Sequence, residues 1–380
     1  MLDEVAIVGV GQTKYERRKI GETFADLVFE VTNKALEDAG ITIRDIDNVV
    51  TVSNDFQDGR TISSMAVMDA CGAFGKNVST VEGDGTLGAL YGLMRVLSGA
   101  FETTLVVAHC KCSEGDQDLI WNSAFDPVYY RRLGLEAVSA SALQARRYMD
   151  KYGVTGEQCA LVPVKNHRNA RANPWAQEAM DLTVEEVMRS PVLASPLKML
   201  DAAPLSDGAC AVIFANRWKA GRMTTKPVWV RGVGHCADAY YLGDRDLAGV
   251  DSLTGAAKRA YGLAGIVDPR KEIDVVEVFE AFGYQELMWL EGLGFCDPGQ
   301  GGVFTAGGNT LMDGPWPVNP SGGVLSAHPG LVAGLVRIAE ACLQVRGDAG
   351  ARQVDGVRTA LAHGTNGLCG QGHCVWVLGG

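Results

Sequence analysis

Ser321-Gly322-Gly323-Val324-Leu325-Ser326-Ala327-His328-Pro329-Gly330 places one histidine on a Pro-Gly corner, directly before an apolar helical run from Leu331 to Leu343. A histidine held in this way can transfer a proton near neutral pH. A second glycine-rich turn, Val81-Glu82-Gly83-Asp84-Gly85-Thr86-Leu87-Gly88, has the outline of a strand-to-helix turn that carries a nucleophile, but glycine occupies that position. The two turns indicate a site with a candidate base and a missing nucleophile.

Composition predicts a well-packed α/β protein. The chain has 380 residues, of which 47% are hydrophobic and 21% charged, so we expect two closely packed domains. The 47 glycines fall singly or in short turns between apolar runs and predict tight corners. The net charge of −11, from 34 basic and 45 acidic residues, disfavours a nucleic acid partner.

The chain also lacks targeting and metal-binding patterns. The start, Met1-Leu2-Asp3-Glu4, leads into the apolar run from Val5 to Val10 without a signal-like stretch, and no apolar run has membrane-spanning length. We therefore expect a cytoplasmic protein that does not contact a membrane. The ten cysteines form no CxxC pair, so we expect reduced thiols and no metal site in this chain.

Two series of alternating strands and helices follow one another. In the first, the strand Val5 to Gly11 precedes an amphipathic helix from Thr23 to Ala39, closed by Gly40. The second opens at Pro227 with another strand that runs into glycines. The repeated order predicts an internal duplication, with domains at 1–225 and 226–380 and an inserted cap at about 113–200.

Several motifs, in this order and spacing, resemble the thiolase superfamily over nearly the whole chain. They are Ala6-Ile7-Val8-Gly9-Val10-Gly11-Gln12-Thr13, Val164 to Ala170 with Asn173-Pro174, Leu205 to Ala209, Val278 to Phe282, Asn319 to Gly334, and Gly367 to Gly372. The resemblance is strongest to sterol-carrier-protein thiolases and to two-subunit thiolases. It implies two duplicated βαβαβαββ halves in a five-layered αβαβα structure with an inserted cap.

The resemblance also implies roles for individual residues. His328 matches the histidine of the family's GHP motif, and Phe279 replaces the asparagine of its Asn-Glu-Ala-Phe motif. The family's nucleophilic cysteine corresponds to Gly85 or Asp84, neither of which can form a thioester. Cys369 lies in the last loop, where the family has its second catalytic residue.

Other candidates have an ordinary structural alternative beside the functional one. Cys369 can equally be a small apolar filler, and the asparagines Asn319 and Asn366 can serve turns instead of holding a water or carbonyl oxygen. His363 or His373 is a candidate second proton carrier. Lys165 to Arg168 is expected to be a solvated basic helix face, with a phosphate contact as the alternative.

Aromatic residues predict an apolar substrate pocket, although such residues more often belong to a core or a dimer interface. Candidate substrate-binding residues are Phe279, Phe282, Tyr240 and Trp316, with Gly323 as a candidate CoA-binding residue and Arg131 and Arg132 at the pocket edge for a carboxylate. An aromatic acyl-CoA that bears a carboxylate would suit this lining.

The resemblance implies thiolysis of a 3-oxoacyl-CoA by CoA, as in the two-subunit thiolases that cleave 2-benzoylsuccinyl-CoA to benzoyl-CoA and succinyl-CoA in anaerobic toluene breakdown. One alternative is a thiolase-fold retro-aldolase that cleaves a 3-hydroxyacyl-CoA such as a steroid side chain. A non-catalytic acyl-CoA-binding scaffold is a second alternative.

The same resemblance implies a partner. A small zinc-ribbon/OB-fold subunit is expected, with zinc only in that subunit, no permanently bound cofactor in this chain, and CoA as cosubstrate. The expected assembly is a homodimer of this chain within a heterotetramer, paired through the segment from Asn77 to Glu82.

Overall fold

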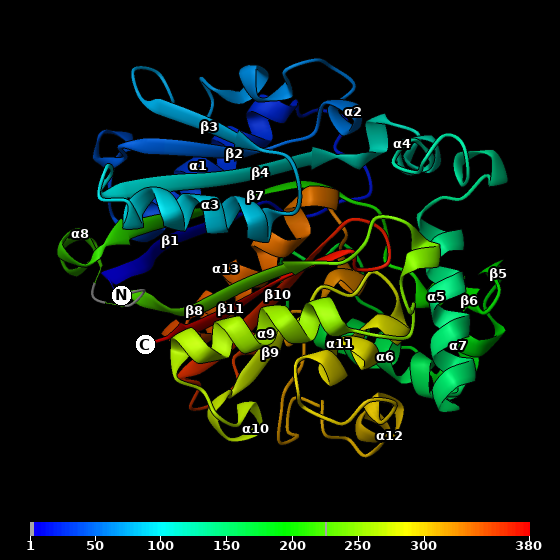
Figure 1. The fold of residues 1–380 in the computed structure, drawn as a ribbon. Helices are drawn as coiled ribbons and strands as arrows, with labels where there is room; N and C mark the ends of the chain where they lie inside the picture. Colours follow the sequence, from blue (N-terminus) through cyan, green and yellow to red (C-terminus); the bar gives the residue numbers. More distant parts are fainter. Residues whose placement is uncertain (1–3, 225) are drawn as a thin grey trace.

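The structure is a computed structural model and describes residues 4–224 and 226–380. Its main feature is one mixed sheet of nine strands in the order β3-β2-β4-β7-β1-β8-β11-β10-β9 (Figure 1). The strands are β1 (Val5–Gln12), β2 (Asn48–Val52), β3 (Asn77–Val81), β4 (Thr103–Lys111), β7 (Asp207–Asn216), β8 (Val228–Ala237), β9 (Val275–Glu277), β10 (Thr359–Asn366) and β11 (Gly372–Gly379), with a separate pair β5 (Val192–Ala194) and β6 (Leu197–Lys198). The α-helices are α1 (Phe24–Ala39), α2 (Asp55–Asp58), α3 (Gly85–Leu97), α4 (Gln117–Ser123), α5 (Ala137–Tyr152), α6 (Gly156–Ala170), α7 (Val184–Arg189), α8 (Arg217–Met223), α9 (Asp251–Ala264), α10 (Pro269–Glu272), α11 (Gly283–Gly292), α12 (Gly301–Ala306) and α13 (Ala333–Arg346).

The sheet consists of two halves with the same strand order. They join between β1 and β8, where Ala6 pairs with Trp229 and Ile7 with Val228. Outward from this junction, each half places its first strand beside its last one, β1 beside β7 and β8 beside β11. The first half ends at the edge strand β3. At the corresponding edge of the second half, Val318 forms an isolated parallel bridge to Val276 of β9. The duplicated α/β architecture predicted from the sequence is confirmed. The predicted domain boundary, between residues 225 and 226, adjoins residue 225, which lies outside the described residues.

A Gly-Val-Gly triplet recurs in both halves for the same steric reason. A Cβ on Gly9 would lie 2.3 Å from the carbonyl oxygen of Ala35 in α1, and one on Gly232 would lie 2.1 Å from that of Ala260 in α9. Gly11 and Gly234 are equally close to the same helices. These glycines let each outer helix pack directly on the first strand of its half.

Three apolar clusters fill the space between five layers, and the central cluster contacts both half-sheets. Leu27 of α1 packs with Ile213 on the outer face of the first half. Between the halves, Leu93 of α3 and Ile338 of α13 share a core with Phe214 and Trp376, whose rings stack at 5.9 Å. A third cluster joins α9 to the second half. The layers are thus α1, one half-sheet, α3 with α13, the other half-sheet, and α9, which confirms the predicted αβαβα order.

The chain between β4 and β7 contains α4 to α7 and β5–β6, which lie at one end of the sheet (Figure 1). The expected solvated basic face at Lys165 to Arg168 was wrong for three of the four residues. Lys165, Asn166 and His167 are buried, because α6 packs against α11 and Lys165 Nζ pairs with Glu286 at 3.0 Å. Only Arg168 is exposed.

In the described part of the chain, no helix combines the length and the apolar character that a bilayer-spanning segment needs.

The N-termini of α3 and α13 meet without room for a side chain. A Cβ on Gly85, the first residue of α3, would lie 2.5 Å from Leu335 Cβ and 2.6 Å from Leu335 N. Gly334 is equally confined, since its Cβ would lie 1.9 Å from Asp84 Oδ2. The two central helices can therefore approach each other only because these positions are glycine.

Replacing Gly85 by alanine is expected to lower the free energy of unfolding by about 1–3 kcal/mol, because the added methyl group overpacks this contact. Gly221→Ala is the control, since a Cβ there meets no atom within 4 Å. Urea denaturation measures both. Equal stability of the Gly85→Ala and wild-type proteins would show that the helix contact is looser than described.

Candidate active site

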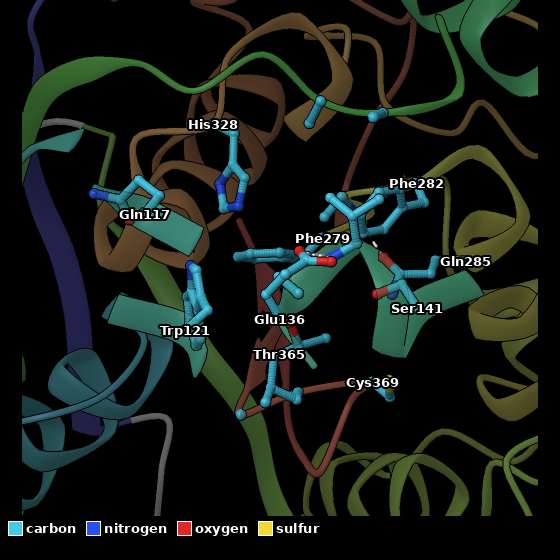
Figure 2. A pocket seen from close by; sticks show the side chains of 18 of the residues that line it. Gln117, Trp121, Glu136, Ser141, Phe279, Phe282, Gln285, His328, Thr365 and Cys369 are labelled. Atoms are coloured by element: carbon cyan, nitrogen blue, oxygen red, sulfur yellow. Dashed lines mark hydrogen bonds between the residues drawn. The ribbon is translucent and has the colours of Figure 1, made fainter. Parts of the chain in front are cut away.

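One cavity of about 250 Å³ opens where the cap meets the ends of the central strands and helices. Figure 2 shows His328, Trp121, Phe279 and Cys369 around this space. The polar and aromatic residues of the lining are Asp84, Gln117, Asp118, Trp121, Glu136, Ser141, Phe279, Phe282, Gln285, His328, Thr365, Asn366 and Cys369. The cavity therefore combines parts of both halves with the cap.

His328 points its ring into the cavity (Figure 2). Its backbone N donates to Pro204 O and Ser206 Oγ, both at 3.0 Å, and its ring meets Phe279 edge-on at 5.5 Å. Among the described residues, nothing bonds to its Nδ1. Burial lowers the pKa of His328 to about 4, so the imidazole is neutral at pH 7 and can accept a proton.

Two buried carboxyl groups accept hydrogen bonds from the backbone of the loop before His328. Glu277 accepts from Ser321 N at 3.0 Å, and Glu280 accepts from Leu325 N at 3.1 Å. Burial, together with the neighbouring Glu286, raises the pKa of Glu280 to about 8. Glu280 is thus a buried anchor of the loop that positions His328.

Asn319 and Gly323 belong to this anchor and not to the cavity lining. Asn319 Nδ2 donates to Glu280 Oε2 at 2.8 Å, and its Oδ1 accepts from Val278 N at 2.8 Å. A Cβ on Gly323 would lie 2.0 Å from Glu280 Oε1. Both positions shape the His328 loop from behind.

Cys369 lines the cavity from the last loop, with a left-handed φ of 54°. Its carbonyl oxygen accepts from Gln144 Nε2 at 3.1 Å. Burial raises the pKa of the Cys369 thiol to about 12, so it carries little thiolate at neutral pH. The structure places this thiol at the site without activating it.

His363 and His373 pair with each other outside the lining. His363 Nε2 lies 2.9 Å from His373 Nδ1, and His363 Nδ1 accepts from Phe279 N at 3.4 Å. Burial lowers the pKa of both rings, that of His373 to about 3. The pair supports the strand end that carries Phe279.

In the turn after β3, Asp84 lines the cavity, whereas Gly85 faces α13. Asp84 Oδ2 accepts from Thr86 N at 2.8 Å and Oδ1 from Gly334 N at 3.0 Å. Burial raises the pKa of Asp84 to about 6. A Cβ on Gly83 would lie 3.4 Å from Asn366 Oδ1, so Gly83, rather than Gly85, is the glycine of this turn that faces a cavity residue.

Of the four predicted substrate-binding residues, the structure brings Phe279 and Phe282 into the lining. Tyr240 is 47% exposed and donates to Ala124 O at 2.8 Å, while Trp316 stacks on Phe304 and donates to Arg270 O at 2.8 Å. Both lie outside the lining.

The two arginines that were expected at the pocket edge, Arg131 and Arg132, also lie outside the lining. Arg131 donates to Phe125 O at 3.1 Å within the cap, and both Arg131 and Arg132 are exposed. Among the described residues, the lining contains no lysine or arginine, but it does contain the carboxyl groups of Asp84, Asp118 and Glu136.

Sequence reasoning missed Glu136, Ser141 and Gln285. Glu136 accepts from Val138 N at 2.6 Å and Ser139 N at 2.7 Å and so begins α5. The capping pattern of Glu136 with Ser139 is visible in the sequence, but it predicts a helix start and not a cavity. Gln285 lies three residues after Phe282, so the two side chains share a helix face. This spacing is the sequence feature that could have placed Gln285 in the lining.

Comparisons with known proteins agree along the whole chain. The family models described as thiolase, N-terminal domain, and thiolase C-terminal domain-like match residues 5–218 and 234–380. The acetyl-CoA acetyltransferase of Methanothermobacter thermautotrophicus is 36% identical over 97% of both chains. The benzoylsuccinyl-CoA thiolase subunit BbsB of Thauera aromatica is 29% identical over 96% of this chain and 95% of its own.

Solved structures extend this similarity to the fold. The Ltp2-ChsH2(DUF35) aldolase superposes with a TM-score of 0.85 at 26% identity and covers 99% of this chain and 98% of that one. Human mitochondrial 3-ketoacyl-CoA thiolase, with a TM-score of 0.73 and 17% identity, covers 100% and 99% and shows the shared fold. With both family models matched and the five-layered fold in place, the chain belongs to the thiolase superfamily.

Proposed function

We propose that this chain cleaves the carbon–carbon bond between the α and β carbons of a 3-hydroxyacyl-CoA, as a thiolase-fold lyase. Among the described residues, the cavity lining contains a neutral histidine as a candidate base but no activated nucleophile. Gly83 and Gly85 flank Asp84 in the turn, and the pKa of Cys369 is raised to about 12. A retro-aldol step needs a base and a stabilised enolate, but no thiolate.

In this mechanism His328 accepts the proton of the β-hydroxyl group. The bond between the α and β carbons breaks, its electron pair forms the thioester enolate, and the β carbon leaves as a ketone or aldehyde. The proton then returns to the α carbon, which yields the shortened acyl-CoA. The side-chain amide of Asn366, in the lining beside Gly83, is the candidate donor for the enolate oxygen.

Thiolysis of a 3-oxoacyl-CoA is the second candidate, favoured by Cys369 in the cavity and by the similarity to an acetyl-CoA acetyltransferase and to BbsB. An acyl-enzyme would have to form on Cys369. Direct attack by CoA would instead require the thioester end of the substrate and the thiol end of a second CoA in the cavity at once. A cavity of about 250 Å³ suits one ligand of modest size better than two.

The charge of the lining favours an acyl group without a carboxylate. Phe279, Phe282 and Trp121 offer apolar and aromatic surface, while Asp84, Asp118 and Glu136 supply the only side-chain charges among the described lining residues. The free carboxylate of 2-benzoylsuccinyl-CoA would find no cation there. We therefore favour an uncharged acyl group of modest size, such as a single alicyclic or aromatic ring.

A small zinc-ribbon/OB-fold subunit is part of the proposal, with zinc in that subunit and two copies of this chain in the assembly. The Ltp2-ChsH2(DUF35) aldolase and the subunit BbsB support a two-component enzyme. The burial of Lys165 and His167 supports it too, because these residues cannot contact CoA phosphates from inside the fold.

Replacing His328 by asparagine is expected to lower kcat by about 10²- to 10⁴-fold, the usual contribution of a positioned acid/base group. His235→Asn is the matched control, since His235 is a partly buried histidine outside the cavity lining. Both variants are assayed together with the partner subunit. Turnover of His328→Asn within threefold of wild type would remove His328 from the mechanism.

Replacing Cys369 by serine distinguishes the two reactions. Cleavage of a 3-hydroxyacyl-CoA is expected to stay within about threefold of wild type, because the lyase step uses no thiol. Cys296→Ser, outside the lining, controls for the loss of a thiol. If wild type cleaves a 3-oxoacyl-CoA only when CoA is present and Cys369→Ser abolishes this, the chain is a thiolase and the lyase proposal fails.

The charge of the lining is tested with two 3-hydroxyacyl-CoA esters that differ only in a carboxylate or its methyl ester on the acyl chain. We expect kcat/KM to favour the ester by at least about tenfold, or ~1.4 kcal/mol. A preference for the carboxylate would contradict our assignment of the acyl group.

A further inference from the structure

Two thiols at the end of β4 lie closer together than atoms in van der Waals contact. Cys110 and Cys112 are both buried, and their Sγ atoms lie 2.7 Å apart. Carbon atoms in van der Waals contact lie about 3.5–4.0 Å apart, whereas a disulfide bond is about 2.05 Å long. The two sulfur atoms thus lie between van der Waals distance and bonding distance.

The pair lies directly behind the cavity wall. A Cβ on Gly330 would lie 3.0 Å from Cys110 Sγ and 3.2 Å from Cys112 Sγ, and Gly330 lines the cavity. The carbonyl oxygen of Cys112 accepts from Gln117 Nε2 at 3.1 Å, and Gln117 is also a lining residue. The two sulfurs therefore lie beside the turn that follows His328, and Cys112 lies at the junction at which β4 leads into the cap.

We infer that Cys110 and Cys112 form a redox-active dithiol that closes to a disulfide when a peroxide oxidises it. One thiolate attacks a peroxide oxygen, the O–O bond breaks, and a sulfenic acid and water form. The second thiol displaces the sulfenic oxygen as another water. In total, two thiols and one hydrogen peroxide give one disulfide and two waters. This site does not depend on which reaction the cavity catalyses.

The surroundings of Cys110 determine how fast the dithiol can be oxidised. The hydrogen bond with Cys112 and burial raise the pKa of the Cys110 thiol well above its ordinary value. Thiolate is therefore scarce at neutral pH. We expect the pair to close slowly with a small oxidant, on the order of hours. The bond would then restrain the backbone where β4 leads into the cap.

The sequence offers a direct assay, because Lys111 lies between the two cysteines. Trypsin cleavage after Lys111 puts Cys110 in the peptide Val96 to Lys111 and Cys112 in the peptide Cys112 to Arg131. The folded protein is incubated with hydrogen peroxide, alkylated with N-ethylmaleimide in denaturant, and digested without reductant. We expect the two peptides to stay linked, and to separate after reduction.

Cys71→Ser, which removes a buried thiol elsewhere, is the control and should leave the link intact. Cys110→Ser and Cys112→Ser should each abolish it. Linked peptides from wild type alone support the proposal even if a variant fails to fold. Separate, alkylated peptides after oxidation of wild type, or a link from Cys110 to any other cysteine, would overturn it.

Coupling of the pair to the cap is measured by hydrogen exchange of residues 112–123. We expect slower exchange in the oxidised protein and a return to the original rate after reduction. Unchanged exchange in a protein shown to contain the disulfide would overturn the link to the cap.

Discussion

The carboxylate of Asp84 joins the N-termini of the two central helices, and the arrangement of the site depends on it. One oxygen accepts from Thr86 N at the start of α3, and the other from Gly334 N at the start of α13. The helices come from different halves of the chain, and their positive dipole ends both face this group. Gly334 and Gly364 leave the space it needs, since a Cβ on either would lie within 2.4 Å of Asp84 Oδ2.

This contact decides what chemistry the turn can support. The N–H groups that could stabilise an oxyanion at these helix ends are used on a side chain of the protein itself. With a pKa of about 6, Asp84 is mostly ionised at neutral pH, and a negative charge there would disfavour a thiolate beside it. In the proposed mechanism the proton transfer falls to His328, whose loop is held in place by a separate set of buried carboxyl groups, those of Glu277 and Glu280.

The sequence predicted the elements whose signals are local. Thr23, Asp26 and Gly40 mark both ends of α1, and the glycines after Val8 and Arg231 mark the two first strands. The order of the motifs predicted the fold and the position of His328 in the site. The cavity lining was harder to predict, because Tyr240 and Trp316 carry the same aromatic signal as Phe279. Their side chains bond to backbone oxygens of other segments, a choice made by long-range packing.

In the proposed function, carbon–carbon cleavage proceeds without a covalent acyl-enzyme. The most direct test is the intact mass of the chain, with its partner subunit, acid-quenched during turnover of 3-hydroxyacyl-CoA and, separately, after incubation with 3-oxoacyl-CoA. We expect unmodified protein in both samples and a shortened acyl-CoA in the first. A mass increase equal to the acyl group, mapped to Cys369 or another thiol, would contradict it.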